Sequence, residues 1–183
     1  MDKIVFITGA SSGIGAGCAR KFASQGASLI LNARNVNKLS ALKEELEKQY
    51  GAKIYLLPFD VRDRKAATSA LESLPKEWQS IDILVNNAGL VIGTDKEQEG
   101  SLDEWDIVID TNIKALLAMT RLIVPGMVER KRGHIINIGS IAGDAAYPGG
   151  SVYCATKAAV KALSDGLRID CLLYTSPSPR DKR

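Results

Sequence analysis

The stretch TGASSGIGAG, Thr8 to Gly17, continues the apolar run KIVFIT (3–8) into a helical pattern over 13–25. Its glycines are spaced G-x-x-x-G-x-G between a strand and a helix. Glycine there permits a tight turn and lets backbone N–H groups approach a pyrophosphate at the helix N-terminus. A purely structural turn is the alternative, but the place after a first strand favours a dinucleotide-binding loop. The predicted loop residues are Gly9, Ala10, Ser11, Ser12, Gly13, Ile14 and Gly15.

Apolar runs alternate with helical patterns along the chain. Runs rich in Ile, Val and Leu lie at 3–8, 27–33, 53–59, 81–87 and 133–139. Helical patterns lie at 13–25, 36–50, 62–73, 102–130 and 151–170. Near-continuous apolarity is typical of strands buried on both faces of a parallel sheet. The alternation therefore predicts an α/β fold, a doubly wound parallel sheet with right-handed crossovers.

Composition limits the classes of function. The 183 residues fit one domain, and 45% of them are hydrophobic, enough for a buried core. Residues 180–183 carry +2 of the net charge of +3, so the basic balance does not indicate nucleic acid as a partner. The three cysteines show no paired or metal-ligand spacing, so we expect neither a disulfide nor a metal site. Charges interrupt the apolar stretch 107–128, so we expect no membrane span and a cytoplasmic protein.

The end of the second apolar run indicates which cofactor the loop would hold. NAD enzymes place an acid about 20 residues after the glycine loop, where it holds the ribose 2′-hydroxyl. This chain has no acid there and offers Arg34 with Asn35 beside it. A guanidinium at that point can pair with a 2′-phosphate. The pattern predicts NADP as cofactor, and the alternative is that Arg34 is only a surface arginine.

Two further strand ends supply candidate cofactor contacts. Asp60 and Val61 follow the third apolar run, where an aspartate can accept from an adenine amino group or simply cap the next helix. The motif NNAG at 86–89 ends the fourth run. Small residues and amides suit a cofactor wall at Asn87, Ala88 and Gly89, and turn chemistry at the sheet edge is the alternative.

The segment SVYCATKAA, residues 151–159, places Tyr153 and Lys157 four apart, on one face of the predicted helix. A phenol has an ordinary pKa of about 10, and a neighbouring ammonium stabilises the phenolate. The pair therefore indicates an acid/base tyrosine, although this spacing also arises by chance. Ser140 lies just past the fifth run and can hydrogen-bond a substrate carbonyl as negative charge develops. Asn112 is either a buried polar group satisfied locally or the holder of an ordered water that connects Lys157 to solvent.

Together these features resemble the short-chain dehydrogenase/reductase family. The resemblance covers residues 3–170 in family order: T-G-x-x-x-G-x-G at 8–15, Asp60, N-N-A-G at 86–89, Asn112, Ser140 and Y-x-x-x-K at 153–157. It implies a Rossmann fold and an NADP-dependent oxidoreductase. It assigns Tyr153 as general acid/base, Ser140 as carbonyl binder, Lys157 as ribose holder and Asn112 as water positioner. Tyr153 and Lys157 would both contact cofactor, and Ser140 and Tyr153 the substrate.

Three segments, at 74–90, 125–143 and 147–158, are similar to a bacterial subgroup, the NADP-dependent 3-hydroxy acid dehydrogenases. The likeness implies oxidation of serine, L-allo-threonine and related 3-hydroxy acids, and reduction of malonic semialdehyde to 3-hydroxypropionate. It also implies a homotetramer for the full-length protein. The alternatives are a 3-oxoacyl-thioester reductase and a non-catalytic cofactor-binding scaffold. The scaffold is disfavoured because the tyrosine and the lysine are both present.

The last stretch, CLLYTSPSPRDKR at 171–183, is unlike the residues before it. Family members continue past Asp170 with two more strands and a segment that covers the substrate, so we expect an incomplete domain at 1–170, truncated after the fifth strand and its following helix. CLLYTSPSPRD resembles one reading frame of a common transposase adapter, which predicts a non-native tail. A disordered Ser/Pro tail and a short isoform are the alternatives. Truncation predicts an exposed fifth strand and an inactive, poorly soluble polypeptide.

Overall fold

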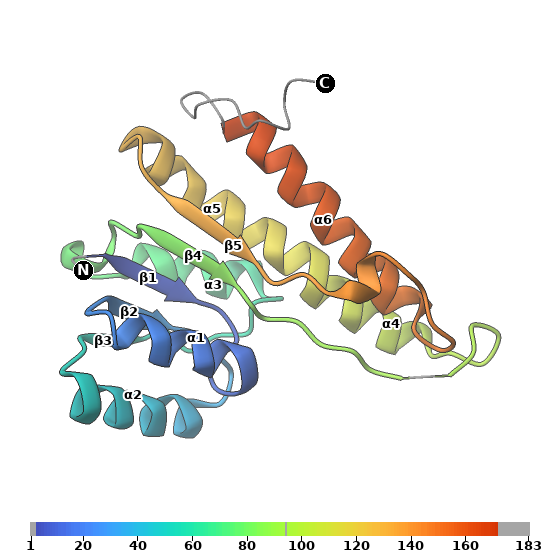
Figure 1. Ribbon diagram of the computed structural model, residues 1–183, viewed down its shortest axis with the longest axis horizontal. Coiled ribbons are helices and arrows are strands. Elements are labelled where there is room, and N and C mark those ends of the chain that lie inside the picture. The colour runs from blue at the N-terminus through green and yellow to red at the C-terminus, as the bar shows by residue number, and fades with distance from the viewer. Residues whose placement is uncertain (1–2, 94, 172–183) are drawn as a thin grey trace.

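The structure is a computed structural model that describes residues 3–93 and 95–171. Its core is a parallel sheet with helices on both faces (Figure 1). The strands are β1 (Ile4–Ile7), β2 (Ser28–Leu31), β3 (Ile54–Leu56), β4 (Ile83–Asn86) and β5 (His134–Asn137). Their order is β3-β2-β1-β4-β5, with every pair parallel. The predicted doubly wound parallel sheet is confirmed, and the described part ends with the helix that follows β5.

The helices match the predicted patterns with one interruption. They are α1 (Gly13–Ala23), α2 (Val36–Tyr50), α3 (Arg64–Glu72), α4 (Leu102–Ile109), α5 (Leu116–Glu129) and α6 (Ser151–Cys171), with short turns η1 (Lys76–Trp78) and η3 (Ile141–Gly143). The predicted helix over 102–130 is broken by η2 (Asp110–Ala115), a π-helical segment. Helix α6 includes the first residue of the predicted tail, and 172–183 lie outside the described residues. None of the helices described is both long and apolar enough to cross a bilayer.

Side chains alternate between the two faces of the sheet and build two buried clusters. Helices α1 and α2 cover one face of the sheet, and α3 and α5 cover the other (Figure 1). In β1, Val5 and Ile7 pack toward α1 and α2, whereas Phe6 packs toward α3 and α5. All three are fully buried, as the near-continuous apolarity of the run predicted. Strand β5 lies at an edge of the described sheet and is only partly buried. The central strands therefore hold the sheet in register, and their carboxyl ends all reach one edge.

The loop after β1 packs tightly against the start of α1. Gly9 has φ 64°, a left-handed conformation that glycine adopts without strain. A side chain at Gly15 would overlap the carbonyl oxygen of Gly9 and come within 2.5 Å of the Asn87 amide. Helix α1 can thus approach the sheet only because position 15 lacks a Cβ. This contact fixes the loop against β4.

Replacing Gly15 with alanine should destabilise the fold by about 1–3 kcal/mol, because the added methyl meets backbone that cannot move away freely. The measurement is the free energy of unfolding in urea. The matched control is Gly17→Ala in the same helix, where a Cβ meets nothing within 4 Å. The free energy of unfolding of that variant should rise by about 0.5–1 kcal/mol. Equal effects at both positions would contradict the packing argument.

Candidate active site

A groove of about 660 Å³ crosses the carboxyl edge of the sheet, where the loops after all five strands meet. Ligand pockets are commonly about 300–1,000 Å³, and in open parallel sheets they lie at this edge. The predicted site residues that line the groove are Gly9, Ser11, Ser12, Gly13, Ile14, Arg34, Asn35, Asp60, Val61, Asn87, Ala88, Gly89, Ser140, Tyr153 and Lys157. Residues far apart in the sequence are therefore brought to one cavity.

Three predicted residues do not line the groove. Ala10 is fully buried, and its N–H donates to the carbonyl oxygen of Asn32 at 2.9 Å. Gly15 is buried under the loop, against Gly9. Asn112 is 2% exposed and lies behind the groove wall. These residues shape the site rather than face it.

Thr8 ties the loop after β1 to the end of β4. Its hydroxyl oxygen accepts from the N–H groups of Asn87 at 3.1 Å and Ala88 at 3.0 Å, and its hydroxyl donates to the carbonyl of Val85 at 3.3 Å. In return, the side chain of Asn87 donates to the carbonyls of Thr8 at 2.9 Å and Gly9 at 3.0 Å. The Asn87 amide hydrogens thus fix the glycine loop. Thr8 belongs to the glycine motif, but sequence reasoning gave it no role.

The N-terminus of α1 opens into the groove. The N-cap residue Ser12 makes no side-chain hydrogen bond to the first turn, and that turn holds no acidic residue. The first N–H groups of a helix have no partner within the helix and carry a partial positive charge. Glycines at 9 and 13 have positive φ and present no side chain. This uncapped end, with its glycine cradle, fits the pyrophosphate of a dinucleotide.

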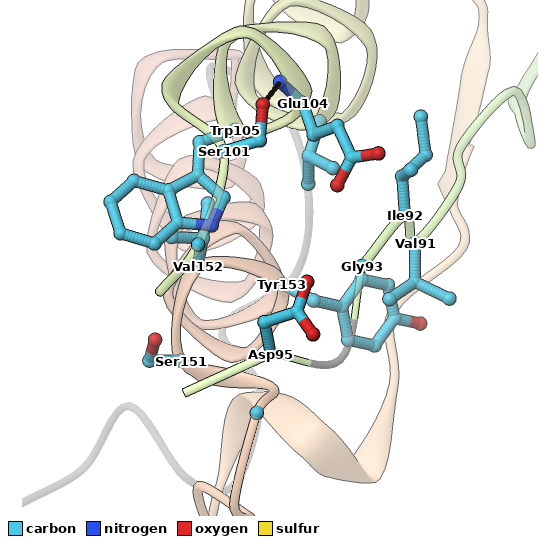
Figure 2. A pocket seen from close by; sticks show the side chains of 13 residues that line it. Val91, Ile92, Gly93, Asp95, Ser101, Glu104, Trp105, Ser151, Val152 and Tyr153 are labelled. Carbon is cyan, nitrogen blue, oxygen red and sulfur yellow. Dashed lines mark hydrogen bonds between the residues drawn. The ribbon is translucent and has the colours of Figure 1, made fainter. Parts of the chain in front are cut away.

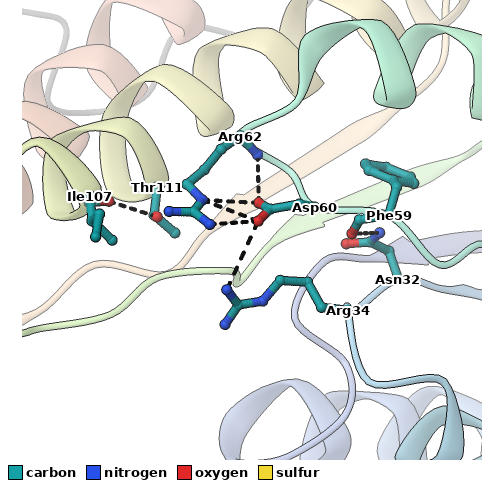
Figure 3. A network of polar contacts seen from close by, with 7 residues as sticks. All are labelled: Asn32, Arg34, Phe59, Asp60, Arg62, Ile107 and Thr111. Atoms are coloured by element: carbon teal, nitrogen blue, oxygen red, sulfur yellow. Dashed lines mark hydrogen bonds and ion pairs between the residues drawn. The ribbon is translucent and has the colours of Figure 1, made fainter.

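Asp60 lies in the loop between β3 and α3 and is held by two arginines (Figure 3). Arg62 Nη2 donates to Asp60 Oδ2 at 2.7 Å, and Arg34 Nη1 lies 3.9 Å from the same oxygen. The hydrogen bonds from Arg62 hold the pKa of the Asp60 carboxyl below its usual range. Asp63, rather than Asp60, caps α3 by accepting from the N–H of Ala66 at 3.0 Å. The capping alternative for Asp60 is therefore wrong.

Tyr153 and Lys157 share one face of α6, as their spacing predicted. Lys157 Nζ lies 5.8 Å from the centre of the Tyr153 ring and donates to the carbonyl oxygen of Ile138 at 2.8 Å. The lysine is 8% exposed, and this burial lowers its pKa. The hydrogen bond to Ile138, just past β5, fixes the ammonium beside the phenol. Both side chains border the groove.

Ser140 begins the short turn η3 at the end of β5. Its hydroxyl oxygen accepts from the N–H of Ala142 at 3.1 Å, which fixes the side chain. A hydroxyl that accepts in this way keeps its hydrogen for a second partner. η3 packs on α6, where a side chain at Gly143 would come within 2.8 Å of the Lys157 backbone. The absence of a Cβ there lets Ser140 and Tyr153 border one groove.

Asn112 lies in the π-helical segment η2 and joins three elements. Its Oδ1 accepts from the N–H of Leu90 at 2.9 Å, and its Nδ2 donates to the carbonyl of Leu90 at 2.9 Å and to Thr156 Oγ1 at 3.0 Å. Thr156 Oγ1 donates in turn to the carbonyl of Tyr153 at 2.7 Å. Both amide hydrogens are engaged within the protein, so they are not available to a water. A water held by the backbone near Asn112 stays a prediction.

A second, smaller pocket lies beside Tyr153 (Figure 2). Its wall combines apolar side chains, among them Val91 and Trp105, with the carboxylates of Asp95 and Glu104. Sequence reasoning missed these residues. They follow no motif: Glu104 and Trp105 lie on α4, which packs near α6, and Val91 and Asp95 lie in the loop between β4 and α4.

Fold and groove together define a Rossmann-type α/β protein with a tyrosine, a lysine and a serine at the sheet edge. The sequence matches the short chain dehydrogenase family over residues 3–174, and the chain belongs to this family.

The chain is also similar to curated proteins that are named NADP-dependent 3-hydroxy acid dehydrogenases. The NADP-dependent 3-hydroxy acid dehydrogenase YdfG of Escherichia coli K12 is 50% identical over 167 residues, which is 91% of this chain and 66% of the relative. An NADP-dependent 3-hydroxy acid dehydrogenase of Schizosaccharomyces pombe is 44% identical over 167 residues, 91% of this chain and 64% of the relative. The chain thus spans about two thirds of the length of these relatives.

Solved structures agree with the fold. Serine dehydrogenase from Escherichia coli superposes with a TM-score of 0.86 at 50% identity, over 91% of this chain and 76% of that one. A closed form of serine dehydrogenase complexed with NADP+ gives 0.87 at 48% identity, over 93% and 67%. An alcohol dehydrogenase from Thermococcus sibiricus, complexed with 5-hydroxy-NADP, gives 0.87 at 27% identity, over 93% and 72%.

Replacing Asn112 with alanine should cost about 2–3 kcal/mol in the free energy of unfolding, because both polar groups of Leu90 lose a partner. Thr156→Val removes one of the three hydrogen bonds of Asn112 and the bond from Thr156 to the Tyr153 carbonyl, but leaves both bonds to Leu90, and should cost about 1 kcal/mol. Urea unfolding gives both values. Hydrogen exchange of the Leu90 amide should also speed up in Asn112→Ala, and an unchanged exchange rate would contradict the assignment.

Proposed function

We propose that this chain carries the cofactor-binding and proton-transfer parts of an NADP-dependent oxidoreductase. The reaction would interconvert the hydroxyl of a short 3-hydroxy acid, of the serine, L-allo-threonine or 3-hydroxypropionate type, and the corresponding carbonyl. One observation carries the proposal: a single groove is lined by Arg34, which follows β2, and by Ser140, Tyr153 and Lys157, which follow β5 on the other side of β1. The names of the Escherichia coli relative and of the NADP+ complex support the cofactor and the substrate class.

The groove offers a partner to each part of the cofactor. The open N-terminus of α1 would hold the pyrophosphate, and Arg34, with Asn35 beside it, would pair with the 2′-phosphate. Asp60 and Val61 would contact adenine, and the wall at 87–89 would lie along the groove with Lys157 at the nicotinamide ribose. When bound there, the nicotinamide supplies the acceptor or donor of a hydride.

The side chains of α6, together with Ser140 at the start of η3, would transfer the proton and orient the substrate oxygen. In the oxidation direction the Tyr153 oxygen takes the proton of the substrate hydroxyl, and in reduction it returns that proton. The Lys157 ammonium, fixed by the Ile138 carbonyl, stabilises negative charge on the phenol oxygen. Ser140, held by the N–H of Ala142, donates its hydroxyl hydrogen to the substrate oxygen and orients it.

Tyr153→Phe should lower turnover by about 10²–10⁴-fold, because it removes the proton-transfer group. Its affinity for NADPH should stay close to the unsubstituted value. Turnover is measured on a chimaera that joins residues 1–170 to the C-terminal third of the Escherichia coli relative, and NADPH affinity on the 183-residue chain by fluorescence titration. The matched control is Tyr50→Phe at the end of α2, which should leave turnover intact. Unchanged turnover in Tyr153→Phe would remove this residue from the mechanism.

The cofactor and the substrate class are tested together with a panel. The chimaera should oxidise serine and 3-hydroxypropionate with NADP+ and should use NAD+ at least about tenfold less efficiently, since the 2′-phosphate would add a charge-assisted contact. An acetoacetyl thioester should be a poor substrate. Preferred reduction of that thioester would instead support a 3-oxoacyl-thioester reductase, and a preference for NAD+ would contradict the role given to Arg34.

A further inference from the structure

The adenosine end of the groove holds two guanidinium groups and one carboxylate (Figure 3). Asp60 and Arg62 form a close pair. Arg62 Nε lies 3.1 Å from Oδ1 and 3.2 Å from Oδ2, Nη2 lies 2.7 Å from Oδ2, and the Arg62 N–H donates to Oδ1 at 3.0 Å. Both carboxylate oxygens are thus engaged by one residue. Sequence reasoning did not include Arg62 among the site residues.

Arg34 is held far more loosely. Its Nη1 lies 3.9 Å from Asp60 Oδ2, beyond hydrogen-bond distance, and its side chain is 68% exposed. The Asp60 and Arg62 side chains are only 29% and 31% exposed. The guanidinium of Arg34 therefore keeps its donors for another anion, whereas that of Arg62 is committed to Asp60.

The summed charge of Arg34, Asp60 and Arg62 explains why it matters that Arg62 is committed to Asp60 and Arg34 is not. Two guanidiniums and one carboxylate sum to +1, which favours an added phosphate. Without Arg62 the sum is zero, and the freed carboxylate would attract Arg34 and repel a phosphate beside it. The other acid that acts on Arg62, Asp110, is itself paired with Lys114 at 2.7 Å. Arg62 is therefore the direct counter-charge of Asp60.

We propose that Arg62 is a specificity-determining positioning residue: it neutralises Asp60 and so leaves Arg34 free to bind the 2′-phosphate that distinguishes NADP from NAD. Arg62 acts through Asp60 and does not itself contact the phosphate. The inference rests on the proposed function, because it concerns the same cofactor. The new element is how the carboxylate of Asp60, 3.9 Å from Arg34, is made compatible with a dianionic 2′-phosphate bound at Arg34.

The test is the ratio of the dissociation constants of NADH and NADPH, measured by fluorescence titration on the 183-residue chain. In Arg62→Gln this ratio should fall about tenfold or more, mainly because NADPH binds less tightly. Any loss of general adenosine contacts or of folded protein affects both cofactors alike and cancels in the ratio. An unchanged ratio in Arg62→Gln would overturn the proposal.

The double variant Asp60→Asn, Arg62→Gln separates an indirect role from a direct one. With the carboxylate removed, Arg34 is free again, so the ratio should return to within about threefold of the unsubstituted value. A ratio that stays low would mean that Arg62 contacts the phosphate itself, and the proposal would be wrong. If Arg62→Gln does not fold, Asp60→Asn alone decides: its ratio should stay equal or rise, and a fall would contradict the proposal.

The chain offers a matched control in another arginine–carboxylate pair. Arg20 donates to Glu45 through Nε at 2.6 Å and Nη2 at 2.8 Å, outside the groove. Arg20→Gln should leave the ratio unchanged, and a comparable fall there would overturn the assignment to Arg62. Failure of the unsubstituted chain to bind either cofactor would instead contradict the proposed function. The two failures are therefore distinguishable.

Discussion

The groove depends on one close approach, that of the loop after β1 to the end of β4. The Thr8 hydroxyl bridges Val85, Asn87 and Ala88. The side-chain amide of Asn87 donates in return to two carbonyl oxygens of the loop. Because Gly15 has no side chain, α1 can begin directly beneath this junction. The open helix N-terminus, the wall at 87–89 and the carboxyl ends of the strands all take their places from this contact.

The second fixed point is the part of α6 around Tyr153, which two hydrogen bonds join to neighbouring elements. Lys157 binds the carbonyl of Ile138 past β5, and Thr156 receives the amide of Asn112 from η2. Both bonds are made on the turn that follows Tyr153. The tyrosine is therefore oriented by its own helix and by two neighbouring elements, while its ring remains at the groove.

Much of the fold was predictable because local periodicity and the hydrophobic core agree. Helix α2 occupies the predicted range 36–50, and each strand lies within its apolar run. A strand is shorter than its apolar run where the hydrogen bonds to the neighbouring strand stop. For example, β3 ends at Leu56, two residues before Pro58, which has no N–H to donate. The π-helical segment η2, which interrupts the predicted helix 102–130, was not predictable from local sequence. Its residue Asn112 bonds to Leu90 and Thr156, which lie 22 and 44 residues away. The Arg62–Asp60 pair is local, but no motif marks it.

The central claim is that the groove holds one dinucleotide, with its diphosphate on α1 and its nicotinamide beside Tyr153. A crystal structure of the chain with NADP+ tests it most directly. We expect diphosphate oxygens within hydrogen-bond distance of the N–H groups at the start of α1. We also expect nicotinamide C4 at a position where a substrate carbon bound at Tyr153 would lie about 3–3.5 Å from it. A diphosphate bound elsewhere, or a nicotinamide turned away from Tyr153, would contradict it.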